Sequence, residues 1–340
     1  RPLLQGLFPS LMLSDAGIAM TAALALFIMP DGDGGRLLDW DTAKGLRWDV
    51  LILFGGGLAL VRDWMDHRLR SADEISAILN VPVLGTVPHM TKFKSIAARG
   101  MIVHNKATSP TAEAYRTIRT AVFFGVPNGQ AKTMLVTSPS PGDGKSTMTS
   151  NMAIAMAQAD QKTLIIDADL RKSVQHEIFS APVDPGVTSI LAGRAQVDDC
   201  IKHTDVPNLD VLPAGPEVPN PSEMLNSTAF GDLLDKLTQT YDRILIDSPP
   251  VMPVTDARIL AAMCDVTLLV LRAQKSTRKA SQQARDGLLS VGGNLLGAVV
   301  NDVTKSAGKY AYYSGGGYGY GTYGYYGRKK TEESRIAPTG

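Results

Sequence analysis

The segment that most constrains the fold is a short apolar run that leads directly into a glycine-rich loop. The run Met134–Thr137 is followed by SPSPGDGKST at Ser138–Thr147, and a helical pattern begins where this loop ends. Gly142 and Gly144 would let the backbone turn tightly, so that successive N–H groups converge on phosphate oxygens in front of the positive end of the helix. A strand, such a loop and a helix in this order are typical of nucleotide-binding α/β proteins.

The side chains of this loop extend the prediction from phosphate to Mg-ATP. Lys145 can reach the β- and γ-phosphates, and the Ser146 hydroxyl can ligate Mg²⁺. A strict G-x-x-x-x-G-K-[ST] pattern would have glycine at position 139, where this chain has proline. The residues expected to bind the nucleotide here are Pro141, Gly142, Asp143, Gly144, Lys145, Ser146 and Thr147.

Apolar runs alternate with helical segments over most of the remaining chain. Helical segments such as Thr147–Ala159 and Phe230–Thr240 lie between these runs. The alternation predicts an α/β fold, a doubly wound and mostly parallel sheet with helices on both faces. The expected strands are Thr133–Thr137, Thr163–Ile166, Leu209–Leu212, Arg243–Ile246, Val266–Leu271 and Leu296–Asn301.

Acidic residues follow two of these predicted strands. Asp167 and Asp169 come after Thr163–Ile166, and Asp247 follows Arg243–Ile246. Ligands of open parallel sheets bind beyond the carboxyl ends of the strands, so these carboxylates would meet beside the phosphate loop. Each aspartate alone could be a loop or capping residue. Together they are what a metal–nucleotide site requires.

Residues 1–70 have a different character from the rest of the chain. Ala16–Met29 and Val50–Val61 are uncharged apolar stretches, and Trp48 and Trp64 bracket the second one. Both are shorter than a bilayer span, which leaves open a buried hairpin packed on the soluble domain. Tryptophans at the ends and basic residues on the C-terminal side favour a membrane hairpin with the following residues in the cytoplasm. The basic residues are Arg62, His67, Arg68 and Arg70.

The other end of the chain carries a segment that cannot build a core. Tyr310–Gly327 contains eight tyrosines and seven glycines without a charge, which predicts a flexible tail. The tyrosines are Tyr310, Tyr312, Tyr313, Tyr318, Tyr320, Tyr323, Tyr325 and Tyr326.

The charge balance argues against nucleic-acid binding, and the cysteine spacing argues against a metal site with cysteine ligands. Lys and Arg number 34 against 33 Asp and Glu, so no net positive field indicates nucleic-acid binding. Cys200 and Cys264 lack metal-ligand spacing and lie in or beside apolar runs, which predicts buried free thiols in a reducing compartment.

Three motifs together resemble those of the bacterial tyrosine kinases. Ser138–Thr147, DADLR at Asp167–Arg171 and IDSPP at Ile246–Pro250 resemble the Walker A, Walker A′ and Walker B motifs of this family. The wider class of deviant-Walker ATPases includes partition and division-site proteins, which usually carry a signature lysine where this chain has Ser140. The resemblance therefore favours the kinase branch.

The resemblance implies roles for particular residues. Lys145, Asp167 and Asp169 would be catalytic, with Asp167 as the base or the group that orients the nucleophile. Mg²⁺ would be held by Ser146, Asp169 and Asp247, although the division of roles between Asp167 and Asp169 stays open. Asn301 could contact the adenine or be a simple turn residue.

The resemblance also implies an assembly and a setting. Glu113, Arg116 and Arg119 fit an E-x-x-R-x-x-R helix that packs subunits into a ring, the alternative being an exposed helix with an ordinary charge pair. The tyrosines at the C-terminal end would be phosphorylated by neighbouring subunits. Family members lie in the inner membrane with a cytoplasmic catalytic domain. They regulate exopolysaccharide or capsule synthesis and export, and work with the export machinery and a cognate phosphatase.

These observations predict four regions: a membrane-associated hairpin at 1–70, a linker at 71–105, a P-loop tyrosine kinase domain at 106–308 and a flexible tail at 309–340. The expected activity is autophosphorylation on tyrosine. The competing hypothesis is a membrane-associated partition-type ATPase scaffold that hydrolyses ATP without phosphorylating protein, with the tail as an adhesive segment.

Overall fold

The computed structural model describes residues 29, 68–69, 72–90, 95–126 and 131–304. Within these ranges the chain forms an eight-stranded sheet in the order β1-β8-β7-β2-β6-β3-β5-β4. All neighbouring strands run parallel except β4, which is antiparallel to β5. The strands are β1 Val83–Pro88, β2 Thr133–Thr137, β3 Thr163–Asp167, β4 Lys202–His203, β5 Leu209–Leu212, β6 Arg243–Asp247, β7 Val266–Arg272 and β8 Leu295–Val303.

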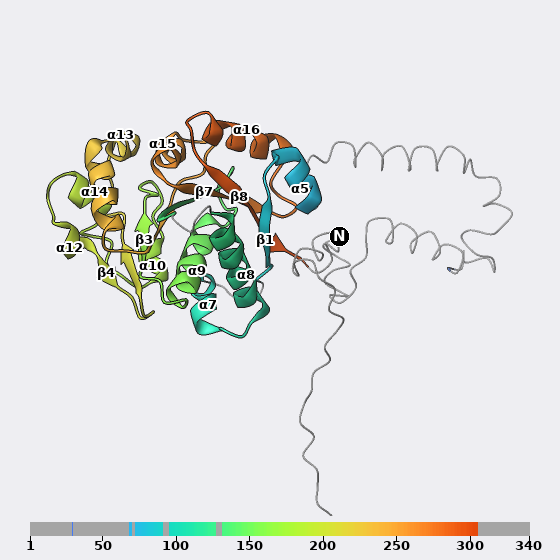
Figure 1. Ribbon diagram of the computed structural model, residues 1–340, viewed down its shortest axis with the longest axis horizontal. Helices are drawn as coiled ribbons and strands as arrows, with labels where there is room; N and C mark the ends of the chain where they lie inside the picture. The colour runs from blue at the N-terminus through green and yellow to red at the C-terminus, as the bar shows by residue number, and fades with distance from the viewer. Residues whose placement is uncertain (1–28, 30–67, 70–71, 91–94, 127–130, 305–340) are drawn as a thin grey trace, which may run out of the picture. The chain divides into compact units, whose positions relative to one another are not determined.

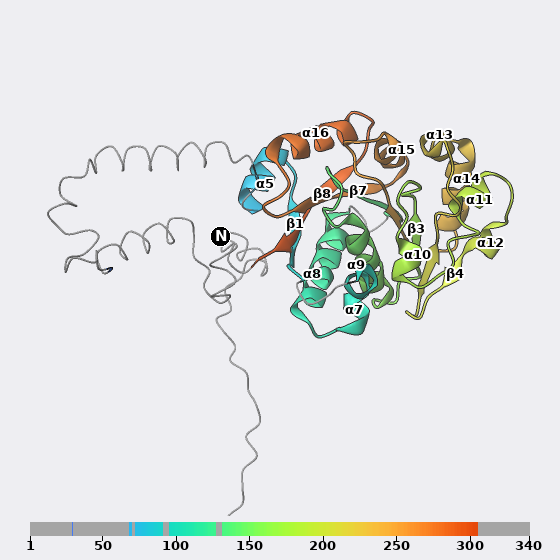
Figure 2. The ribbon, with the colours of Figure 1, turned by 180° about the vertical axis from the view of Figure 1, so that it is seen from behind.

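Helices cover both faces of the sheet (Figures 1 and 2). One face carries α5 Ala72–Leu79, α13 Pro221–Leu225, α14 Thr228–Thr238, α15 Asp256–Met263 and α16 Arg278–Leu289. The other carries α7 Ile102–Asn105, α8 Pro110–Gly125 and α9 Lys145–Ala157. The remaining helices are α6 Ile96–Gly100, α10 Gln175–Ile178, α11 Val187–Leu191 and α12 Val197–Cys200. The predicted doubly wound α/β fold is confirmed, as is each predicted strand to within two residues.

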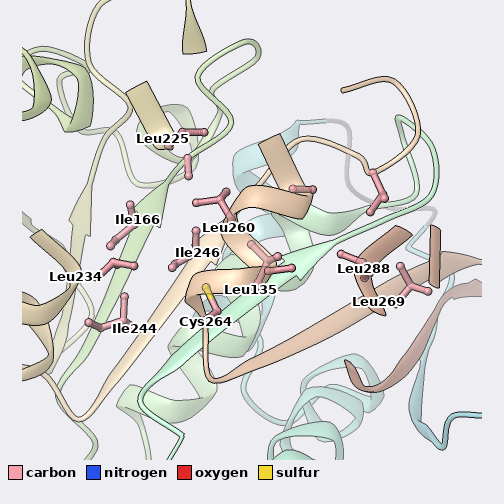
Figure 3. Close-up of a cluster of buried hydrophobic side chains, with 14 of the residues drawn as sticks. Leu135, Ile166, Leu225, Leu234, Ile244, Ile246, Leu260, Cys264, Leu269 and Leu288 are labelled. Carbon is pink, nitrogen blue, oxygen red and sulfur yellow. The ribbon is translucent and has the colours of Figure 1, made fainter. Parts of the chain in front are cut away.

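The period-two alternation of the strands builds two separate cores. In β6, Ile244 and Ile246 pack in the cluster beneath α14, α15 and α16, whereas Leu245 packs in the cluster beneath α8 and α9. Figure 3 shows the first cluster, in which Ile244 and Ile246 lie among Leu234 and Leu260 from the covering helices. Because successive strand residues point to opposite faces, a strand buried on both sides must be apolar at nearly every position.

The described part of the interval 71–105, expected to be a linker, contributes a strand to the sheet. Its strand β1 pairs in parallel with β8, with Pro88 opposite Val303. Its helix α5 buries Ile75 and Leu79 in the core. The short run around Val83 includes Pro82 and Gly85, which sequence patterns treat as turn residues, but β1 is an edge strand, where such residues are tolerated.

Both cysteines are buried and free, as predicted. Burial raises the pKa of the Cys200 thiol and that of the Cys264 thiol.

Of the predicted membrane hairpin at 1–70 the structure describes Met29, Arg68 and Leu69, and the tyrosine-rich segment lies outside the described residues. Within the ranges that the structure describes, no helix has both the length and the apolar character needed to cross a bilayer.

Candidate active site

The phosphate loop joins β2 to α9 at the carboxyl end of the parallel strands. Gly142 and Gly144 take left-handed φ angles of 80° and 99°, which L-residues with a side chain rarely adopt. A Cβ on Gly144 would lie 2.0 Å from the Asn301 amide nitrogen. The loop therefore needs glycine at position 144, both for its backbone conformation and for space.

Lys145, the first residue of α9, lies among the predicted carboxylates. Its Nζ is 2.7 Å from Asp169 Oδ2 and 3.7 Å from Asp247 Oδ1. Burial alone would lower the pKa of Lys145, but the attraction of Asp247 and Asp169 raises it above its ordinary value. The lysine is thus held as a cation at the start of the helix.

Asp167 and Asp247 meet because β3 and β6 are in register at their last residues. Both side chains are fully buried. Asp167 Oδ2 accepts hydrogen bonds from the backbone N–H groups of Val174 and Gln175, at 3.0 and 2.9 Å, whereas its Oδ1 has no hydrogen-bond partner. Burial, and then the nearby Asp247 charge, raise the pKa of Asp167 well above the usual range of a carboxyl group.

Gln175 completes this group, which we term the central cluster: Lys145, Asp167, Asp169, Gln175 and Asp247. The Gln175 amide donates to Asp247 Oδ2 at 2.8 Å and to the Ser146 carbonyl at 3.1 Å. It is fully buried. No sequence motif singles out Gln175, because its role depends on α10 lying beside both β6 and α9.

A cavity of about 480 Å³ opens beside the central cluster. Asp169 lines it, whereas the fully buried Asp167 and Asp247 do not. The two acids of the DADLR motif therefore differ in their access to the cavity. The expected nucleotide-binding residues that line the cavity are Pro141, Gly142, Gly144, Lys145, Ser146, Thr147 and Asn301.

Asp143 and Asn301 support the loop from within the protein. Asp143 does not line the cavity, and its Oδ2 accepts the Ser140 N–H at 3.1 Å. Burial raises the pKa of Asp143 to about 6. The Asn301 amide donates to the Asp143 carbonyl at 3.0 Å, and its oxygen accepts the Asp302 N–H at 2.9 Å. Asn301 is therefore more than a turn residue, since it ties β8 to the phosphate loop.

A second group of residues, the flanking cluster, also contacts the loop: His89, Arg272, Lys275, Asn301 and Asp302. Arg272 donates to the Gly142 carbonyl at 3.2 Å and to Asp302 Oδ2 at 2.6 Å, and Asp302 also pairs with His89. Lys275 donates to the Pro141 carbonyl at 3.4 Å. Apart from Asn301, sequence reasoning missed this cluster, which forms where β1, β7 and β8 end together.

Arg171, the last residue of the DADLR motif, lines the cavity, and its hydrogen-bond partners lie outside the central cluster. Its Nε is 2.8 Å from Asp256 Oδ2, and its Nη2 is 3.2 Å from Asp256 Oδ1 and 3.0 Å from the Ser222 hydroxyl. Asp256 is fully buried at the first position of α15. No role was predicted for Asp256 or Ser222 from the sequence.

The three residues predicted to mediate oligomerisation lie on α8. Glu113 pairs with Arg116 in the same helix, and Arg116 also donates to the Ala107 carbonyl at 2.7 Å. Arg119 donates to the Ala155 carbonyl of α9 at 2.8 Å. The charge pair within an exposed helix, which was the alternative to a role in assembly, is present, and the Glu113 side chain is 63% exposed. Contacts between subunits remain a prediction.

The residues present fit Mg-ATP. Buried oxygens of Asp167 and Asp247 lack hydrogen-bond partners, and Gly142 and Gly144 of the loop line the cavity. No three His, Cys, Asp or Glu side chains in the described part of the chain form a metal site by themselves. Mg²⁺ is usually bound by one or two carboxylates together with substrate phosphates and water, so such a cage is not required.

The chain is similar in sequence and in fold to known tyrosine-protein kinases. The family model described as an AAA domain matches residues 131–283. The chain is 39% identical over 226 residues to the putative tyrosine-protein kinase CapB of Staphylococcus aureus, which covers 66% of this chain and 99% of CapB. The solved kinase domain of the Escherichia coli tyrosine kinase ETK superimposes with a TM-score of 0.62 at 29% identity. It covers 72% of this chain and 96% of that domain.

Some relatives are much longer than this chain. The tyrosine-protein kinase ptk of Acinetobacter johnsonii is 33% identical over 309 residues, which is 84% of this chain but 42% of that protein.

Proposed function

Because the chain belongs to the family of bacterial tyrosine-protein kinases, we propose that it transfers the γ-phosphoryl group of ATP to its own C-terminal tyrosines. The acceptors would be the tyrosines of Tyr310–Gly327 on neighbouring subunits. The observation that carries the proposal is the position of Lys145, between Asp169 and Asp247 at the end of a phosphate loop that lines a 480 Å³ cavity.

Binding would use the loop and the acids beside it. The N–H groups of the loop and the start of α9 would hold the phosphates, and Lys145 would stabilise charge on the transferring phosphoryl group. Ser146, Asp169 and Asp247 would hold Mg²⁺, which neutralises phosphate charge when bound. Two observations support this assignment: Ser146 and Asp169 line the cavity, and the buried Oδ1 of Asp247 has no hydrogen-bond partner.

Asp167 is proposed to accept or orient the proton of the acceptor. A tyrosine hydroxyl has a pKa of about 10 and stays protonated near neutral pH, so its attack on phosphorus needs a base or a strong orienting group. Asp167 Oδ1 has no competing hydrogen bond, and the N–H groups of Val174 and Gln175 hold the carboxylate in place through Oδ2.

Asn301 would act at the other end of the nucleotide. It lines the cavity, and one amide N–H remains after its bond to the Asp143 carbonyl. A contact from this N–H to the adenine would add to the support that Asn301 gives the loop.

The setting follows from the same family membership. The kinase would regulate exopolysaccharide or capsule synthesis and export from the inner membrane, with residues 1–70 as the membrane-associated part and the catalytic domain in the cytoplasm. Subunits would assemble through Glu113, Arg116 and Arg119, and a phosphatase would reset the tyrosines.

The test is to incubate the purified full chain with Mg-ATP and to map phosphotyrosine by mass spectrometry. Phosphate is expected on tyrosines between Tyr310 and Tyr326. The variant Lys145→Met should lose labelling by at least about a hundredfold, because the principal cation of the transferring group is removed. Lys279→Met, which removes an exposed lysine on α16, is the matched control.

Two results would overturn the proposal. One is a Lys145→Met chain that labels as fully as the unchanged protein. The other is ATP hydrolysis without any phosphotyrosine, which is the behaviour expected of a partition-type ATPase.

A further inference from the structure

Arg171 and its two partners, Asp256 and Ser222, are the strongest polar assembly that the proposed chemistry does not use. Three separate segments bring them together: the turn after β3, the start of α13 and the start of α15. Asp256 is fully buried, whereas the Arg171 side chain is 41% exposed and lines the cavity. Burying a carboxylate is costly even when it is paired, so this ion pair is weak evidence for a purely stabilising role.

The hydrogen bonds fix the direction of the guanidinium group. Nε and Nη2 form one edge of the planar group, and both donate to Asp256. Ser222 also bonds to Asp256 and accepts from Nη2, which leaves little freedom to rotate. Nη1 lies on the opposite edge, away from the buried carboxylate, and has no hydrogen-bond partner among the described residues.

The backbone of Arg171 is held equally firmly relative to the central cluster. The N–H of Lys172 donates to the Asp169 carbonyl at 3.1 Å and to Asp169 Oδ1 at 3.0 Å, closing a turn around Arg171. Asp169 in turn is bound to Lys145. The backbone turn that carries Arg171 is therefore fixed relative to Lys145, because Asp169 contacts both.

The charges of the site indicate what this edge would bind. The central cluster holds one cation, Lys145, with three carboxylates, so a phosphoryl group entering it needs further donors. The Nη1 of Arg171 keeps two N–H groups that can donate to phosphate oxygens, and hydrogen bonds between charged partners are among the stronger ones.

We propose that Arg171 binds a phosphoryl group in the cavity and that Asp256 and Ser222 are positioning residues which aim it. The inference deepens the proposed kinase function and rests on it for its biological meaning. The phosphoryl group could come from the γ-position of ATP or from a phosphotyrosine already formed on an acceptor, and the two sources are separable by experiment.

The test measures binding by calorimetry to the full chain, so that it does not depend on phosphoryl transfer. One arm compares ADP with a non-hydrolysable ATP analogue, both with Mg²⁺. The other arm titrates O-phosphotyrosine into the chain saturated with Mg-ADP. Arg171→Ala should weaken either the ATP analogue or O-phosphotyrosine by about tenfold, as expected for a charge-assisted bond, with ADP within about twofold. Arg194→Ala, which removes an exposed arginine outside the cavity, should change neither ligand.

A double-mutant cycle tests the positioning role. Asp256→Asn should weaken the same ligand by about threefold to tenfold, and combining it with Arg171→Ala should add nothing further, because Asp256 acts through Arg171. Ser222→Ala, a milder change, gives the same readout with a smaller effect if the Asp256 variant does not fold.

The inference would be overturned if Arg171→Ala bound both ligands within about twofold of the unchanged chain, or if the effects of Arg171→Ala and Asp256→Asn were additive. A chain that binds as expected but forms no phosphotyrosine would count against the proposed function and leave this inference standing.

Discussion

The central and flanking clusters both contact the phosphate loop, but their surroundings differ. In the central cluster Asp167, Gln175 and Asp247 are fully buried. In the flanking cluster His89 and Arg272 have side chains that are 39% and 36% exposed. Electrostatic interactions weaken steeply with exposure to water, so similar contacts should have unequal consequences. We therefore expect the central cluster to determine the chemistry and the flanking cluster to tune nucleotide affinity.

The largest effect is expected from Asp167→Asn. An amide cannot accept the tyrosine proton, and a general base typically contributes at least about a hundredfold to the rate. The rate of phosphotyrosine formation should fall by about that factor, while the Kd for ATP stays within about threefold. Asp232→Asn, an exposed change on α14, should leave both unchanged. A rate within tenfold of the unchanged protein would remove Asp167 from the chemistry and point to Asp169, which lines the cavity.

The next effect concerns stability rather than rate. Gln175→Ala removes the donor for the buried Oδ2 of Asp247 and a second hydrogen bond to the Ser146 carbonyl of α9. The free energy of unfolding should fall by about 1–3 kcal/mol, measured by denaturant titration. Gln282→Ala, at an exposed position of α16, provides the baseline. Equal stability of the two variants would show that water replaces the glutamine at no cost.

A smaller effect is expected from Arg272→Ala in the flanking cluster. The loop loses the hydrogen bond at the Gly142 carbonyl, and Asp302 loses one of its partners. One partly exposed hydrogen bond is worth about 1 kcal/mol, so the KM for ATP should rise by about fivefold with kcat within twofold. Steady-state kinetics would check this. A fall in kcat as large as that from Asp167→Asn would abolish the distinction between the two clusters.

The smallest effect is expected from His89→Ala. His89 and Asp302 form a partly exposed pair, and pairs of this kind contribute about 0–1 kcal/mol. Because Asp302 keeps Arg272, the KM for ATP should change by less than about threefold. If His89→Ala matched Arg272→Ala, the two side chains would act as one unit, and the end of β1 would be as important to the loop as β7.

The same two clusters show how far sequence reasoning reaches. Lys145, Asp167 and Asp247 could be predicted because each follows a buried strand or loop in a recognisable local pattern, and parallel strands deliver their ends to one edge. No role was predicted for Gln175, Arg272 or Asp302, since their roles arise only from which elements become neighbours. The strand β1 was not predicted for the same reason. Its pairing with β8 joins segments more than 200 residues apart.

The buried thiols have a practical consequence. The sequence holds only Cys200 and Cys264, and both are buried with raised pKa values, so little reactive thiolate forms near neutral pH. A single cysteine introduced at an exposed position, such as Lys279→Cys on α16, would react with maleimide dyes far faster than either native thiol. The folded protein is thus ready for site-specific fluorescent labelling without prior removal of its own cysteines.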